Sequence, residues 1–215
     1  HFIVIVTDKN TEPSKKLLKK LVDYLNNRKF NEVATLGEQI LKDFPNNAFV
    51  MNMLGLANFN IGEKTVALNW LKKAYEITPG NLETASNLAL ILYSEGKYEE
   101  AIPIFETIVR TKSDVPEILF NYAIALEKAG FLDKAESTYE KIVKLREDFG
   151  PAHYNAGLLM QRKGNTTQAV SYLEKAVALM SDNAEVIAAL GSVLKENGDY
   201  EKAKEKNTCS NQHEG

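Results

Sequence analysis

One small residue recurs at a fixed interval through most of this 215-residue sequence. Glycines lie 34 residues apart, at Gly62, Gly96, Gly130, Gly164 and Gly198. An alanine follows each glycine by five residues, at Ala67, Ala101, Ala135, Ala169 and Ala203. A third column, seven residues before each glycine, is always small: Gly55, Ala89, Ala123, Gly157 and Gly191. Three columns in phase over five periods indicate a chain built from one repeated structural unit.

Each column has a structural reason. The glycine column suits the end of a helix, because glycine adopts the left-handed cap conformation without steric cost. The other two columns are placed to lie on facing sides of two helices, where small side chains let the backbones approach closely. Larger apolar residues at offsets of three and four, such as Leu88 and Leu92, fill the rest of the seam. Each unit is therefore predicted to be a helix, a short turn and a second helix.

The columns also place the helices along the chain. We predict first helices at residues 48–61, 82–95, 116–129, 150–163 and 184–197. We predict second helices at 64–77, 98–111, 132–145 and 166–179.

A 34-residue period with small residues at its eighth position, glycine at its fifteenth and alanine at its twentieth resembles the tetratricopeptide repeat. This resemblance implies an all-α fold, a right-handed α–α superhelix (a solenoid) of antiparallel helix hairpins. We predict six repeats in residues 14–206, namely 14–47, 48–81, 82–115, 116–149, 150–183 and a truncated 184–206. The first is divergent, with Leu21, Arg28 and Val33 in the three columns. Residues 1–13 and 207–215 are predicted tails, the second of them disordered.

Composition narrows the classes of partner. The net charge is −3, which gives the whole chain no electrostatic reason to bind nucleic acid or anionic membrane. No apolar run approaches the roughly 18 residues that a membrane helix needs, so we expect no membrane insertion. The single cysteine, Cys209, favours a reducing compartment, and we expect a cytoplasmic protein.

The residues that usually carry chemistry do not form a recognisable site. His1 and His213 lie in the predicted tails, and His153 falls at a packing position, where we expect a core histidine. No His, Cys, Asp or Glu pair has metal-ligand spacing, and the glycines are spread rather than clustered as in a phosphate-binding loop. We therefore predict that the chain is not an enzyme and has no cofactor or metal.

In the architecture that the resemblance implies, first helices line the concave side. Two residues before the small column stand Met53, Asn87, Asn121, Asn155 and Ala189. An asparagine amide can bond a peptide C=O and N–H together. Helices about 8–10 Å apart would offer one asparagine per roughly three residues of an extended ligand. This is similar to the asparagine ladder of the family's glycosyltransferase members. The alternative is that the asparagines stabilise the stack through neighbouring backbone.

Aromatic residues flank this predicted ladder. The candidate peptide-binding groove consists of Asn52, Phe59, Asn87, Tyr93, Phe120, Asn121, Tyr154 and Asn155. Phe120 and Tyr154 are placed to hold ligand side chains, with packing between repeats as the alternative. The positions of the carboxylate clamp found in chaperone-binding family members carry no Lys or Arg. We do not expect an acidic chaperone tail to bind by that route.

Three functions remain open from the sequence. The first is a non-catalytic scaffold that binds an extended peptide or a partner helix in the concave groove. The second is the recruiting or oligomerising arm of a larger sulfotransferase, glycosyltransferase or methyltransferase. The segment from Leu17 through Phe44-Pro45-Asn46-Asn47 to Gly55 resembles the opening of bacterial tetratricopeptide proteins that continue into such a domain, and the chain does not begin with Met. The third is self-assembly into a homo-oligomer through exposed terminal hairpins.

Overall fold

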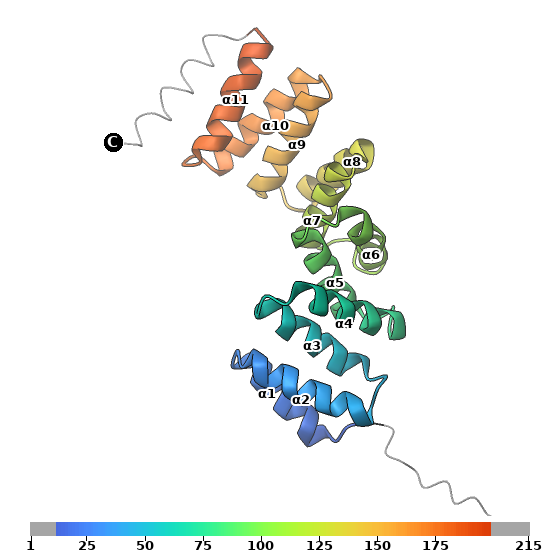
Figure 1. Cartoon of the computed structure of the whole chain (residues 1–215). Coiled ribbons are helices and arrows are strands. Elements are labelled where there is room, and N and C mark those ends of the chain that lie inside the picture. Colours follow the sequence, from blue (N-terminus) through green and yellow to red (C-terminus); the bar gives the residue numbers. More distant parts are fainter. Residues whose placement is uncertain (1–11, 199–215) are drawn as a thin grey trace, which may run out of the picture. The chain divides into compact units, whose positions relative to one another are not determined.

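The computed structural model describes residues 12–198, in which all regular structure is α-helical (Figure 1). The chain divides into two compact units, His1–Ile108 (unit 1) and Val109–Gly215 (unit 2). Unit 1 contains α1 (Lys15–Asn26), α2 (Phe30–Asp43), α3 (Ala48–Asn60), α4 (Lys64–Ile77) and α5 (Leu82–Ser94), and α6 (Tyr98–Thr111) runs across the division. Unit 2 contains α7 (Pro116–Lys128), α8 (Leu132–Leu145), α9 (Gly150–Arg162), α10 (Thr166–Leu179) and α11 (Ala184–Glu196).

These helices confirm the all-α prediction and the predicted helix positions. For example, the helix predicted at 48–61 is α3, and the helix predicted at 166–179 is α10. The divergent first repeat also forms a hairpin, α1 and α2. The second helix of the sixth repeat, most of the N-terminal tail and the whole C-terminal tail lie outside the described residues, so the six-repeat division stays a prediction there.

The turn between the helices of a hairpin has one geometry throughout. The column glycines have positive φ angles, from 71° at Gly96 to 92° at Gly62. At the C-terminal end of α3, the N–H of Glu63 donates to the carbonyl of Asn58 at 2.9 Å. This hydrogen bond between residues five apart is typical of a Schellman motif, in which a glycine, here Gly62, ends the helix. In the divergent hairpin Arg28 takes the same role at φ 56°, and no other non-glycine residue in the described range has a positive φ.

Asparagines begin several of the first helices. The side chain of Asn47 accepts from the N–H of Val50 at 3.0 Å, and Asn81 accepts from Thr84 at 3.0 Å in the next repeat. Each bond satisfies a backbone donor that has no partner inside its helix. The ends of the helices are therefore defined by local sequence as well as by packing.

Close approach of the two helices defines each hairpin. A Cβ added to Gly55 of α3 would lie 2.4 Å from Cγ of Leu71 in α4. The same addition to Gly157 of α9 would lie 2.6 Å from Cγ of Leu173 in α10. Both distances are far below van der Waals contact, so the leucine of the second helix occupies the space that a side chain on the first would need.

The hairpins stack through continuous apolar cores, one in each unit. In unit 1, α3 packs against α1 and α5 as well as α2 and α4, and Leu21, Val33 and Leu54 are fully buried between them. In unit 2, α9 packs against α8, α10 and α11 around Leu159 and Leu173. The first helices α1, α3 and α5 therefore lie side by side in unit 1, as do α9 and α11 in unit 2. Within the described range, none of the helices combines the length and apolar character that a membrane-crossing helix requires.

The positive φ of the turn glycines gives a first test. An added Cβ would meet nothing within 4 Å at either Gly130 or Gly80, but only Gly130 has a positive φ, of 85°. We expect Gly130→Ala to lower the free energy of unfolding by about 1 kcal/mol, because left-handed backbone is strained for alanine. Gly80→Ala is the control and should be neutral or slightly stabilising. Urea denaturation followed by circular dichroism measures both, and equal effects would contradict the assignment.

The close approach within a hairpin gives a second test. We expect Gly157→Val to lower the free energy of unfolding by about 1–3 kcal/mol, because Leu173 must move to accommodate the new side chain. Gly80→Val introduces the same side chain where nothing lies within 4 Å. The expected result is a lower urea midpoint for the Gly157 variant than for the Gly80 variant.

Candidate functional site

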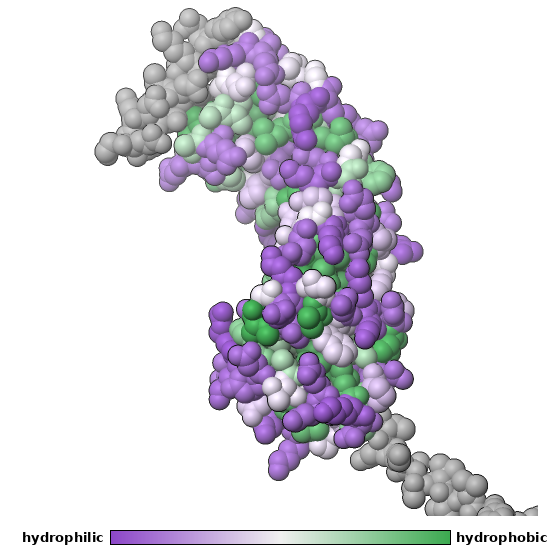
Figure 2. Space-filling view, in the orientation of Figure 1, coloured by the Kyte–Doolittle hydropathy of each residue, from purple (hydrophilic) through white to green (hydrophobic). Residues whose placement is uncertain are grey.

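The first helices of unit 1 expose apolar side chains on one side. The helical period places Phe49, Leu56 and Phe59 on one side of α3, and Leu90 and Tyr93 stand at equivalent positions of α5. Phe49 is 41% exposed and Leu90 is 42% exposed, while the other three are half-buried. We call these five residues the first-helix face of unit 1. Figure 2 shows several separate apolar areas among hydrophilic residues on the side of unit 1 that is in view.

Two of the predicted groove asparagines hold the stack of unit 1 together. Asn87 donates from Nδ2 to Oδ1 of Asn52 at 3.1 Å, and Asn52 donates in turn to Oε1 of Glu83 at 3.5 Å. Asn52 is only 2% exposed. These bonds connect α3 to α5. In unit 1 the asparagines therefore stabilise the stack, and their partners are side chains rather than the backbone.

The other two asparagines differ. Asn121 of α7 and Asn155 of α9 are half-buried, and neither side chain has a hydrogen-bond partner among the described residues. Each amide therefore keeps both its donor and its acceptor. Of the four asparagines in the predicted groove, these two remain available for a ligand backbone.

Phe120 packs inside unit 2. Its ring meets that of Phe149 edge to face, with centroids 5.2 Å apart, and lies 6.3 Å from the ring of Tyr139. The guanidinium of Arg146 covers Phe149 at 4.1 Å. The half-buried Phe120 ring thus connects α7 to α8 and to the start of α9, as the packing alternative expects.

Tyr154 links two repeats of unit 2. Its hydroxyl donates to Oε1 of Glu185 at 2.9 Å, which connects α9 to α11. Burial, followed by the bond to this carboxylate, raises the pKa of Tyr154 to about 12. The hydroxyl is therefore neutral at physiological pH and acts as a donor between repeats.

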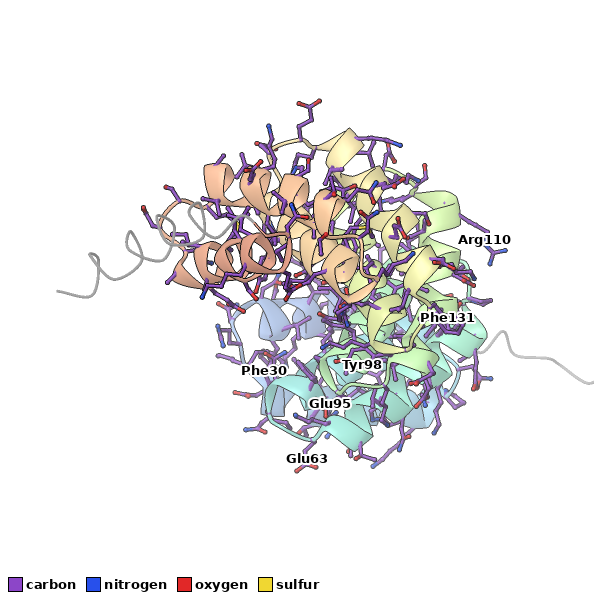
Figure 3. All side chains as sticks on the ribbon, turned by 90° about the horizontal axis from the view of Figure 1, so that it is seen from above. Phe30, Glu63, Glu95, Tyr98, Arg110 and Phe131 are labelled. Carbon is purple, nitrogen blue, oxygen red and sulfur yellow. The ribbon has the colours of Figure 1, made fainter. Side chains whose placement is uncertain are left out.

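Tyr93 packs at the end of its helix. Its ring lies 5.8 Å from the ring of Tyr98 in a T-shaped contact, and burial raises the pKa of Tyr93, with a smaller effect of Tyr98. Figure 3 labels Tyr98 and Glu95, which lie at the turn between α5 and α6. Phe59, at the equivalent position of α3, is half-buried.

A column of acidic residues was not singled out from the sequence. Glu83 and Glu185 occupy the second position of their helices, and each accepts a hydrogen bond from a side chain 31 residues earlier, Asn52 or Tyr154. The constant offset is a signal that could have identified them. Unit 2 carries further links of this kind, from Gln161 to Glu196 at 2.7 Å and from Arg162 to Glu127.

His153 lies where the core was expected. It is 7% exposed, and Nε2 donates to the carbonyl of Glu147 at 2.9 Å. Nδ1 is buried without a hydrogen-bond partner in the described structure. No group of three or more His, Cys, Asp or Glu residues within residues 12–198 is arranged to hold a metal ion.

Solved structures with a similar fold include those of YrrB and MamA. YrrB, described as a TPR protein with an unusual peptide-binding site, has a TM-score of 0.78 and 19% identity over 84% of this chain and 93% of its own. MamA has a TM-score of 0.71 and 19% identity over 75% of this chain and 94% of its own. MamA of Desulfovibrio magneticus RS-1 has a TM-score of 0.70 and 18% identity, over 79% and 96% of the two chains. At these identities the similarity shows the fold, and the solenoid architecture is confirmed.

No curated protein matches the chain. Family models described as tetratricopeptide repeat match residues 18–81, 92–156 and 161–205. These matches cover most of the sequence, and the chain belongs to the tetratricopeptide repeat family.

Proposed function

We propose that this chain is a non-catalytic scaffold that binds a partner protein, and that the first-helix face of unit 1 receives the apolar side of a peptide or helix from that partner. The observation that carries the proposal is the exposure of Phe49 and Leu90 on adjacent first helices. Large apolar side chains left exposed together on a rigid surface are typical of interaction sites. YrrB, which shares the fold, is described as having a peptide-binding site.

The size of the effect supports a specific contact. Burying a Phe or Leu side chain completely contributes about 1.5–3 kcal/mol. Since Phe49 and Leu90 are each about two-fifths exposed, covering what remains contributes about 1 kcal/mol per residue. Together they account for roughly a 30-fold change in affinity. The half-buried Leu56, Phe59 and Tyr93 widen the same surface.

A second, separate contact is proposed for unit 2, and it does not depend on the first-helix face of unit 1. The amides of Asn121 and Asn155 have no partner in the described structure and stand at equivalent positions of α7 and α9. We propose that they bond the backbone of an extended peptide. The backbone is the same in every sequence, so this contact contributes affinity without selecting for particular ligand side chains.

The apolar part is tested with the double variant Phe49→Ser/Leu90→Ser. Peptides that bind the wild-type chain are selected from a synthetic library, and their affinity is measured by fluorescence anisotropy. We expect the variant to bind them about tenfold or more weakly. The matched control is Val66→Ser/Ile77→Ser on the second helix α4, where the side chains are 37% and 43% exposed. Equal weakening by both variants, or by neither, would refute the assignment of this face.

The polar part is tested by comparing two asparagine pairs. We expect Asn121→Ala/Asn155→Ala to weaken the selected peptides about three- to tenfold and to leave the free energy of unfolding unchanged. Asn52→Ala/Asn87→Ala should instead lower that free energy by about 1–2 kcal/mol, because it removes the bonds between α3 and α5. If the Asn121 and Asn155 variant binds like the wild type, the backbone-directed contact does not exist.

The other two functions stated from the sequence, the arm of a larger transferase and self-assembly through terminal hairpins, stay predictions. So does the cytoplasmic location. No described residue bears on them.

A further inference from the structure

One side of the first helix of unit 1 carries a net positive charge. Lys15, Lys16, Lys19 and Lys20 are all exposed and lie within an arc of about 140°, at about 100° of rotation per residue, and this arc also contains the exposed Asp23. The opposite side of α1 packs through Leu21 against α2 and α3. We call these four lysines the lysine face.

The lysine face has no acidic partners. None of its four ammonium groups forms an ion pair with any of the residues 12–198, whereas lysines elsewhere do, such as Lys64 with Glu95 at 2.8 Å. Lys20 lies 5.5 Å from the ring centroid of Tyr24, its aromatic neighbour. Residues 14–30 contain six cationic residues and one acidic residue, while residues 31–108 contain five cationic and ten acidic ones. The charge of unit 1 is therefore segregated, with the positive part on α1 and its following turn.

Two hollows meet at Lys20. One, of about 520 Å³, is lined by Ser14, Lys16, Leu17, Lys19, Lys20 and Asp23. The other, of about 310 Å³, lies between α1 and α2 and is lined by Lys20, Tyr24, Asn31, Glu32, Thr35, Leu36 and Gln39. Both present hydrogen-bond donors beside ammonium groups, which is the surrounding that a carboxylate needs.

The repeat shows what kind of molecule can cover this side of α1. The positions equivalent to Lys16, Lys19 and Lys20 in the next repeat are Val50, Met53 and Leu54, which are at most 4% exposed because α1 and α2 cover them. An apolar hairpin cannot cover the lysine face in the same way, because it would bury ammonium groups without partners. A covering molecule must supply negative charge.

We propose that the lysine face binds an acidic, extended segment of a partner protein. Alternate side chains of an extended chain are about 6.6 Å apart, and residues one turn apart on a helix, such as Lys15 and Lys19, are about 6 Å apart. Carboxylates at alternate positions therefore match the lysines along α1. The lysine face and the first-helix face share no residue and bind through different chemistry, so the inference does not depend on the proposed function.

Two other anionic partners fit less well. A helix that lies on a membrane buries its apolar side in the lipid, but the apolar side of α1 is already packed in the hairpin. A nucleic acid presents a dense and regular row of phosphates, so it cannot avoid the carboxylates of Asp23 and Glu32, which line the two hollows. A peptide can place its carboxylates between these acidic groups.

The test uses the full chain and a fluorescent decapeptide with glutamate at alternate positions, against the same peptide with glutamine. Wild type should bind the glutamate peptide at least about tenfold more tightly, with an affinity that falls as salt rises. Lys16→Gln/Lys19→Gln/Lys20→Gln should weaken that binding about tenfold, and the corresponding Arg variant should retain it. The control removes the same charge from exposed lysines elsewhere in unit 1, with Lys42→Gln/Lys73→Gln/Lys97→Gln, and should change binding less than about twofold.

Four outcomes overturn the proposal. The first is that the wild type does not prefer the glutamate peptide, and the second is that the two Gln triple variants weaken binding equally. The third is that anionic vesicles or an oligonucleotide bind more tightly than the peptide. The fourth is that the chain self-associates in sedimentation and that only the Lys16, Lys19 and Lys20 variant abolishes this. Failure of the Phe49 and Leu90 variant to affect library peptides would overturn the proposed function alone, so the two ideas fail separately.

Discussion

The structure depends on one close contact, made where the two helices of a hairpin cross. At Gly55 and Gly157 the leucine of the second helix fills the space where a side chain on the first helix would lie. The distance between the helices then determines how apolar residues of successive hairpins meet, and the buried cores of both units follow from it. The turn glycines keep the two helices antiparallel at this distance.

Polar contacts between neighbouring repeats help to determine how each hairpin is aligned along the next. In unit 1 the bonds run from Asn87 to Asn52 and on to Glu83, and in unit 2 Tyr154 bonds Glu185. Asn52 is buried, so a slip of one hairpin along the next would leave its amide unpaired at a cost of about 1–3 kcal/mol. The exposed Glu83 and Glu185 could bond water instead. The same bonds use up groups on the first helices that would otherwise be free to meet a ligand.

What is left over on the surface is unevenly distributed. Unit 1 keeps exposed apolar side chains at Phe49 and Leu90 and a run of unpaired lysines on α1. In unit 2, Glu127 and Gln161, at the positions equivalent to Phe59 and Tyr93, are bonded to other side chains within the stack. The two apolar and cationic surfaces are therefore in unit 1, whereas the unpaired Asn121 and Asn155 lie in unit 2.

The sequence by itself determined the fold. The Gly62 column predicts the turn, the Gly55 and Ala67 columns predict the close packing of the two helices, and each column recurs five times. It also determined that His153 belongs to the core. Only the tertiary structure decided which groove residues are free. Asn52 and Asn121 were both candidates for peptide contact, but one is buried in bonds to the next helix and the other is unpaired. That difference depends on which side chains from neighbouring repeats come within hydrogen-bonding distance. The spacing of one column along the chain does not predict those contacts.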